Sequence, residues 1–229
     1  MVCLEFLEEW KTTGDPDNSR FLLVDNGSEA EERILIVADD YCLRYLAAAT
    51  TWYLDGNFSL APQFFKQLYV IRVPVAPSDS IITAAYCLLE RKTQQTYEIM
   101  LQSLLDECAN RDLFPDPSVL YMDFEKAAMQ AATRILGEHI SIRGCFYHLC
   151  QSTFRKVQEL GLQKTYMDNP QLNSFCGKLD GLAFLPINDV GMEMEYLKTT
   201  PEGQEFLDLL KYFDATYVSG TSRKIGNIT

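Results

Sequence analysis

Two aspartates, Asp55 and Asp123, have the surroundings expected of a metal-dependent catalytic site. Each follows a short apolar run that reads as a strand, "WYL" before Asp55 and "VLYM" before Asp123. Neighbouring strands lie about 4.8 Å apart, so carboxylates at their ends can share divalent cations. Paired Mg²⁺ or Mn²⁺ ions, which prefer hard oxygen ligands, can activate a water or hydroxyl and stabilise the leaving oxygen in phosphodiester cleavage.

Each aspartate also has a purely structural interpretation. Asp55 precedes Gly56, and an Asp-Gly pair is typical of a tight turn. Asp123 precedes a predicted helix, where aspartate is a common N-cap. Taken singly, each residue favours structure; taken as a pair, they leave both interpretations open.

A second reactive group is Cys145-x-x-His148, with Cys150 close behind. Thiolate and imidazole are zinc ligands, but a structural zinc site needs four of them. Cys176 is the one nearby residue that could help complete the set, so zinc is not favoured. Spacing alone indicates a core thiol at Cys145 and a hydrogen-bonded His148 at the mouth of a cleft. His139 reads as a loop or surface residue.

Four aromatic side chains follow Asp55 closely. Phe58, Phe64, Phe65 and Tyr69 could stack on nucleic-acid bases, although such residues mostly fill a hydrophobic core.

Charge and composition narrow the functional class. The net charge of −12 argues against a protein that coats nucleic acid, and residues 1–40 alone hold eleven acids and three bases. Between residues 143 and 164 four bases face one acid, which indicates a local basic strip. Seven scattered cysteines, an acidic N-terminus and the lack of a long apolar run predict a nuclear or cytoplasmic protein that is neither secreted nor membrane-bound.

The hydrophobic periodicity predicts which elements position these residues. Strands are expected at 20–25, 33–38, 51–54, 67–75, 81–89 and 118–124, and a short helix at 41–49. Apolar residues at helical spacing predict a helix over 97–108, and a second helix over 125–137 is closed by Gly137. A further strand begins near Ser141 and runs into a third helix, and from about Asn169 only helices and loops are expected.

This order, β-β-β-α-β-α-β-α followed by a C-terminal helical extension, predicts an α/β protein with a mixed sheet. The strand after the first long helix returns parallel to the first strand of the meander, which is the ribonuclease-H-like arrangement. That arrangement would bring Asp55 and Asp123 side by side.

Three stretches in this order resemble the transposase core of Mutator-like elements (MULE): residues 33–71, 118–132 and 144–162. The resemblance extends from about Phe21 to Tyr217. It implies a ribonuclease-H-like DDE transposase that cuts DNA and joins the freed 3′ hydroxyl to target DNA with divalent metal. It also implies that Asp55 in "DGNF" and Asp123 in "YMDFEKA" are the first two catalytic, metal-binding residues.

The family's Cys-x-x-His signature matches Cys145 and His148, which the resemblance makes active-site accessory residues. Its third catalytic residue, a glutamate after a "YF-x-x-TY" stretch, has no counterpart behind "YFDATYVSG" (212–220). Glu202, Glu205 and Asp214 are disfavoured substitutes. We therefore expect that any Mg²⁺ or Mn²⁺ is held weakly.

The expected organisation is an acidic cap and loop at 1–19, a ribonuclease-H-like core at 20–165 and a truncated helical insertion at 166–229. One hypothesis is a DDE nuclease and strand-transferase core that acts on DNA. The alternative is a catalytically inactive, transposase-derived module that binds protein or DNA. A homo-oligomer is compatible with both hypotheses, and a mixed α/β domain with an unknown ligand is the third and least specific interpretation.

Overall fold

The computed structural model describes residues 8–220 except residues 15 and 79. The chain divides into two units, Met1–Ile142 and Arg143–Thr229, and each is described by itself. The boundary precedes the predicted one at residue 165, so the third helix of the predicted core belongs to the second unit. The predicted division of roles among 1–19, 20–165 and 166–229 stays a prediction.

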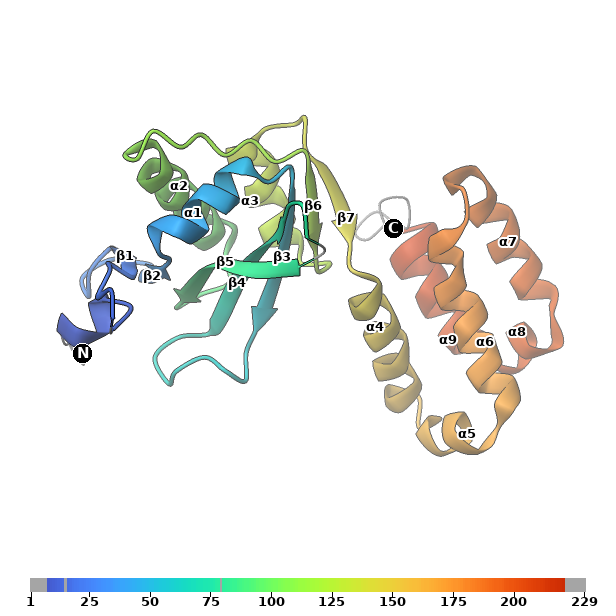
Figure 1. The fold of residues 1–229 in the computed structure, drawn as a ribbon. Helices are drawn as coiled ribbons and strands as arrows, with labels where there is room; N and C mark the ends of the chain where they lie inside the picture. Colours follow the sequence, from blue (N-terminus) through green and yellow to red (C-terminus); the bar gives the residue numbers. More distant parts are fainter. Residues whose placement is uncertain (1–7, 15, 79, 221–229) are drawn as a thin grey trace. The chain divides into compact units, whose positions relative to one another are not determined.

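A seven-stranded mixed sheet runs through the described part of the chain, in the order β1-β2-β5-β4-β3-β6-β7 (Figure 1). Its strands are β1 (Leu22–Asp25), β2 (Ile34–Val37), β3 (Thr51–Asn57), β4 (Gln67–Val75), β5 (Ser80–Leu89), β6 (Val119–Met122) and β7 (Ser141–Gly144). Strands β3, β4 and β5 form an antiparallel meander, and β6 pairs with β3 in parallel. The two strands predicted before the first helix add antiparallel neighbours at the β5 side.

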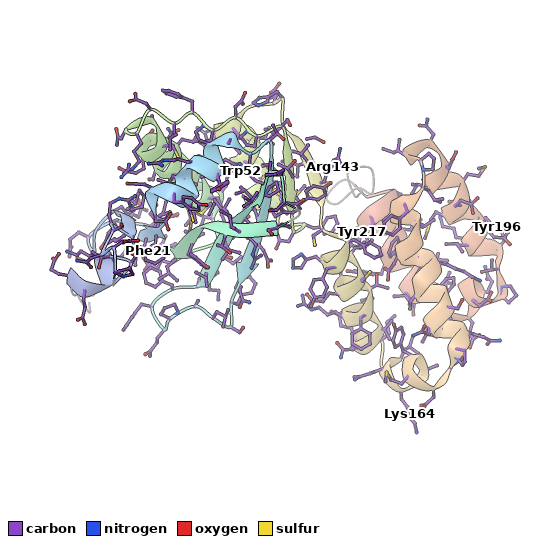
Figure 2. The ribbon with its side chains drawn as sticks, viewed as in Figure 1. Phe21, Trp52, Arg143, Lys164, Tyr196 and Tyr217 are labelled. Atoms are coloured by element: carbon purple, nitrogen blue, oxygen red, sulfur yellow. The ribbon has the colours of Figure 1, made fainter. Side chains whose placement is uncertain are left out.

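Three helices share one hydrophobic core with this sheet. They are α1 (Asp40–Ala48), α2 (Gln94–Ala109) and α3 (Lys126–Leu136). Trp52 of β3 is fully buried and donates its indole N–H to the carbonyl of Leu46 in α1, 3.2 Å away (Figure 2). On the same face of the sheet, the ring of Tyr69 contacts that of Tyr97 in α2, with 5.3 Å between centroids. Helix α3 packs beside α2.

Local chemistry fixes where the helices begin. Helix α2 has Thr93 as its N-cap, and the Thr93 hydroxyl accepts from the backbone N–H of Thr96 at 3.0 Å. Glu32, which is 5% exposed, accepts hydrogen bonds from the hydroxyls of both threonines. A buried carboxylate is therefore satisfied at the positive end of a helix. Helix α3 ends at Gly137, whose φ of +104° suits glycine.

The described part of the second unit begins with the last two residues of β7 and is otherwise built from helices. Its helices are α4 (Phe146–Glu159), α5 (Gln163–Asp168), α6 (Pro170–Gly181), α7 (Ile187–Thr199), α8 (Pro201–Glu205) and α9 (Leu207–Phe213), with short turns of 3₁₀-helix at Leu182–Phe184 and π-helix at Asp214–Val218. Helix α4 packs on α6 and α9, and α6 also contacts α8. The core of this unit includes Leu149, Phe175 and Phe213, all fully buried.

These elements confirm the predicted mixed α/β architecture and the order strand-strand-strand-helix-strand-helix-strand-helix, followed by further helices. The arrangement is compatible with a ribonuclease-H-like fold. Within the described residues, no helix has the length and apolar character needed to cross a membrane.

Candidate functional site

Asp55 lies in β3, and Asp123 directly follows β6, the strand that pairs with β3 in parallel. The parallel register of β3 and β6 matches Thr51 with Val119, Trp52 with Leu120 and Tyr53 with Tyr121. Continued by two residues beyond the observed pairs, the same register would match Asp55 with Asp123. The rings of Tyr53 and Tyr121 stack at 5.1 Å between centroids, which shows that this face of the two strands is in step immediately before the aspartates.

The Asp55-Gly56 pair does not form a turn, so that interpretation is wrong. Strand β3 continues to Asn57, and Asp55 pairs with Val70 while Gly56 pairs with Tyr69 of β4. A Cβ atom at Gly56 would lie 2.7 Å from Oε1 of Gln67 and 3.3 Å from the Tyr69 ring. Glycine suits this position because neighbouring side chains, first the end of Gln67, come this close, and not because the chain reverses.

Replacing Gly56 with alanine should therefore destabilise the first unit, by about 1–3 kcal/mol, because the added methyl overpacks a filled site. Denaturant unfolding followed by tryptophan emission measures this, since Trp10 and Trp52 are the chain's two tryptophans and both precede residue 143. The clash is with Gln67, so Gln67→Ala should recover part of the loss in a double-mutant cycle. Strictly additive losses would contradict this packing role.

An arginine lies near Asp55. Nη1 of Arg72 in β4 is 3.9 Å from Oδ2 of Asp55, and the two side chains are 42% and 40% exposed. An ion pair this long and this exposed contributes little to stability. It does place a cation beside the carboxylate, so a metal ion bound at Asp55 would compete with Arg72.

Asp123 follows β6 directly and is not the N-cap of the next helix. Glu125 holds that position, and its backbone N–H donates to Oδ1 of Asp123 at 3.2 Å. The carboxylate of Glu125 bonds to Nζ of Lys92 at 2.9 Å. The N-cap interpretation of Asp123 is therefore wrong, although its carboxylate does organise the turn into α3.

A chain of buried polar groups lies behind this turn. Gln67 is fully buried and donates from Nε2 to the Tyr97 hydroxyl at 2.6 Å. Burial raises the pKa of Tyr97, against the lowering effect of the Gln67 bond, and the carboxylate of Glu125 raises it further. Burial, followed by the charge of Asp123, raises the pKa of Tyr69 well above its ordinary value. Both tyrosine hydroxyls therefore stay protonated at neutral pH, and the charges of Asp123 and Glu125 act on both.

Oε1 of Gln67 is buried and has no hydrogen-bond partner among the described residues. It is the atom nearest to the position of a Cβ at Gly56. Leaving a buried amide oxygen unpaired costs roughly 1–3 kcal/mol. This unpaired oxygen lies close to Gly56, the residue that follows Asp55 in β3.

The comparison with known families identifies the segment that holds both aspartates. Residues 51–152 match the model of the MULE transposase domain. The chain contains a MULE transposase domain. The matched segment begins with β3 and ends within α4. A search of curated proteins found no match to the chain.

The MULE transposase domain also contains the Cys-x-x-His motif, which lies in the second unit. Cys145 is the N-cap of α4, and a hydrogen bond with the His148 side chain lowers the pKa of the Cys145 thiol. Both side chains are partly exposed. This pair therefore presents a thiol with a lowered pKa at the start of a helix.

The other two cysteines of the second unit behave in the opposite way. Burial raises the pKa of Cys150 and of Cys176 to about 12, and the nearby carboxylate of Asp180 adds to the effect. Asp180 itself has a raised pKa because of its burial, and it accepts from the Thr153 hydroxyl at 2.6 Å. His139, predicted as a surface residue, is about half exposed and has Nε2 2.9 Å from Oδ1 of Asp116.

A third metal ligand is not found in the described part of the chain. No three His, Cys, Asp or Glu residues between 8 and 220, leaving out 15 and 79, are grouped so as to hold a metal ion. Of the disfavoured substitutes, Asp214 binds Lys198 at 2.7 Å and Glu202 lies 3.7 Å from Lys178, both within the second unit.

Sequence reasoning missed the residues that surround the aspartates. Arg72, Gln67, Lys92 and Glu125 all contribute to the site. Glu125 carries the one signal that could have found it, since an acid two residues after Asp123 in "YMDFEKA" follows the same strand.

Proposed function

We propose that the MULE transposase domain of this chain has a ribonuclease-H-like fold and binds a divalent cation through Asp55 and Asp123, to act on phosphodiester bonds of DNA. The observation that supports this is the parallel register of β3 and β6, with the stacked rings of Tyr53 and Tyr121 two residues before the two aspartates. The matched family supports a transposase-related function.

The residues fit the donor chemistry of such an ion. Carboxylate oxygens are the ligands that Mg²⁺ and Mn²⁺ prefer. The protein supplies two of them, so water and phosphate oxygens would complete the coordination. A bound ion of this kind stabilises charge on attacking and leaving oxygens. The chain's own contribution is to align the carboxylates, with Glu125 N–H holding Asp123 and Arg72 beside Asp55.

The proposal predicts that metal stabilises the first unit. With a Kd of about 1 mM, about 10 mM Mg²⁺ adds about 1.4 kcal/mol, or a rise in Tm of roughly 3–5 °C. Asp55→Asn and Asp123→Asn should each abolish the rise while leaving the fold intact. Thermal unfolding followed by tryptophan emission, with EDTA as reference, measures the difference.

Asp116→Asn is the matched control, because this aspartate is 81% exposed on the loop after α2 and should leave the metal response unchanged. Comparison must be between shifts and not between absolute Tm values, since removing one of two like charges can raise the metal-free Tm by itself. An equal shift in wild type and Asp55→Asn, or no shift in wild type, would exclude this metal site.

The second candidate is a catalytically inactive, transposase-derived interaction module. It is favoured by the finding that the described residues contain no three-ligand metal group. It predicts that supercoiled plasmid is not nicked even with Mn²⁺. Metal-dependent nicking above an Asp55→Asn, Asp123→Asn double variant would reject it.

Several narrower assignments belong to the same proposal. Cys145 and His148 are proposed as active-site accessory residues, with no zinc site at this pair. DNA is the proposed partner, and a nuclear or cytoplasmic location and a homo-oligomeric state stay predictions.

A further inference from the structure

The loop between β3 and β4, residues 58–66, carries exposed aromatic rings. In Figure 1 this loop is the cyan segment that leaves the sheet at the end of β3. Four aromatics look alike in the sequence, but the structure separates them. Phe65 and Tyr69 are buried, at 8% and 1% exposure, whereas Phe58 and Phe64 are each 50% exposed.

The loop is held in place by its own hydrogen bonds. Oδ1 of Asn57 accepts from the Leu60 N–H at 3.1 Å and from the Ser59 hydroxyl at 2.9 Å. Phe65 N–H bonds to the carbonyl of Pro62 at 2.9 Å, and the ring of Phe65 is buried. Since both ends of the loop are anchored, the outward rings are fixed by the fold.

Basic residues gather beside these rings. Nζ of Lys92 lies 4.3 Å from the centre of the Phe58 ring. Lys66 N–H bonds to the carbonyl of Leu89, which brings Lys66 to the turn that contains Arg91 and Lys92. Lys66 and Arg91 are exposed and make no ion pair with any described residue.

This cluster is a local exception in an acidic unit. Residues 1–142 contain twenty-two acids and eleven bases, yet residues 58–66 contain no acid. The cluster is also connected to Asp123. Nζ of Lys92 binds the carboxylate of Glu125 at 2.9 Å, and the Glu125 N–H donates to Asp123. Phe58 follows Asp55 by three residues.

We propose that this loop is a stacking platform for unpaired bases of a DNA strand, with Phe58 and Phe64 against the bases and Lys66, Arg91 and Lys92 along the phosphates. The inference rests on the proposed action on DNA. It adds that the loop binds DNA in its single-stranded form. Aromatic rings interleaved with cations are the chemistry by which single strands are bound without base-specific contacts. An apolar protein partner would explain the rings and leave the cations without a role.

The test is binding of a fluorescent single-stranded oligonucleotide by the full chain in EDTA, measured by anisotropy. Wild type should bind the single strand more tightly than a blunt duplex of the same sequence. Phe58→Ala and Phe64→Ala should each weaken binding roughly 5- to 100-fold. Phe114→Ala is the matched control, since Phe114 is 75% exposed on another loop of the same unit and should change nothing.

Two further measurements separate stacking from charge. Wild type should bind a strand with abasic residues more weakly than it binds the normal strand. The Phe58→Ala, Phe64→Ala double variant should bind the two strands equally well. Lys66→Gln with Arg91→Gln should lower the slope of log affinity against log salt by about 0.7 for each phosphate that is no longer neutralised, and Arg134→Gln on α3 should not. The platform would be overturned if wild type bound the abasic and the normal strand equally well, or if it bound neither of them.

The use of EDTA keeps this test apart from that of the proposed function. Strand binding without metal-dependent plasmid nicking would leave the platform in place and reject catalysis. Nicking by a double phenylalanine variant that binds single strands as wild type does would reject the platform and leave catalysis in place.

Discussion

Gly203→Ala is expected to destabilise the second unit by about 3 kcal/mol or more, enough to unfold much of it. Gly203 is buried in α8, where a Cβ atom would overlap the backbone carbonyl oxygen of Leu197. Its N–H also bonds to the Thr200 hydroxyl at 3.1 Å, which holds the helix start in place. Because the obstacle is backbone, no rotation of a side chain can relieve it. Far-ultraviolet circular dichroism during denaturant unfolding measures the loss of helix.

The matched control has the opposite sign. Gly177 lies exposed in α6, and an alanine Cβ there would meet no atom within 4 Å. Gly177→Ala should therefore stabilise the same unit by about 0.5–1 kcal/mol, since alanine loses less backbone entropy in a helix. Equal effects of the two substitutions would show that the approach of Gly203 to Leu197 does not constrain the fold.

Cys145 is expected to be the most reactive of the six cysteines in the described part of the chain. The pKa is lowered only at Cys145, by its bond with His148, whereas burial raises the pKa of Cys42 and Cys108 to about 11 and that of Cys87, Cys150 and Cys176 to about 12. The thiolate is the nucleophile, so Cys145 should hold much more of it at neutral pH than Cys42 does. The lower nucleophilicity of a low-pKa thiolate offsets part of this, which leaves an expected rate advantage of about tenfold or more.

Timed alkylation with iodoacetamide, followed by peptide mass spectrometry, measures each rate. Cys42 is the internal standard, because it is as partly exposed as Cys145 but has a raised pKa. The reaction of Cys145 should slow as the pH falls through its lowered pKa. His148→Gln should move that profile to higher pH, and His139→Gln should not move it, since His139 contacts Asp116 instead. A rate at Cys145 equal to that at Cys42 would contradict the lowered pKa.

Much of the fold could be predicted because its elements are periodic. The alternation of β3 buries Trp52 and Leu54, and the helical spacing in α2 buries Met100 and Leu104, so local pattern and tertiary structure agree. The parallel pairing of β3 with β6 followed from connection rules alone. The pairing of the two strands that lead to Asp55 and Asp123 was therefore predictable from the order of the elements.

The wrong predictions arose where a contact between residues far apart in the sequence overrode the local sequence pattern. The Asp55-Gly56 pair has the sequence of a turn, but the glycine is required by Gln67, which lies eleven residues away on the next strand. Lys92 and Glu125 are far apart in the chain and meet only in the folded unit. Pattern reasoning has no access to this pairing, although the acid two residues after Asp123 was a signal for Glu125 itself.

The stacked rings of Tyr53 and Tyr121 determine how the acidic row is formed. A slip of one residue between β3 and β6 would part the rings and turn the two aspartates to opposite faces of the sheet, so the aromatic contact opposes any such slip. The fold thus keeps the two strand ends that carry the aspartates in step. In the proposed metal site, a cation would have to overcome the repulsion between two carboxylates and displace Arg72 from Asp55.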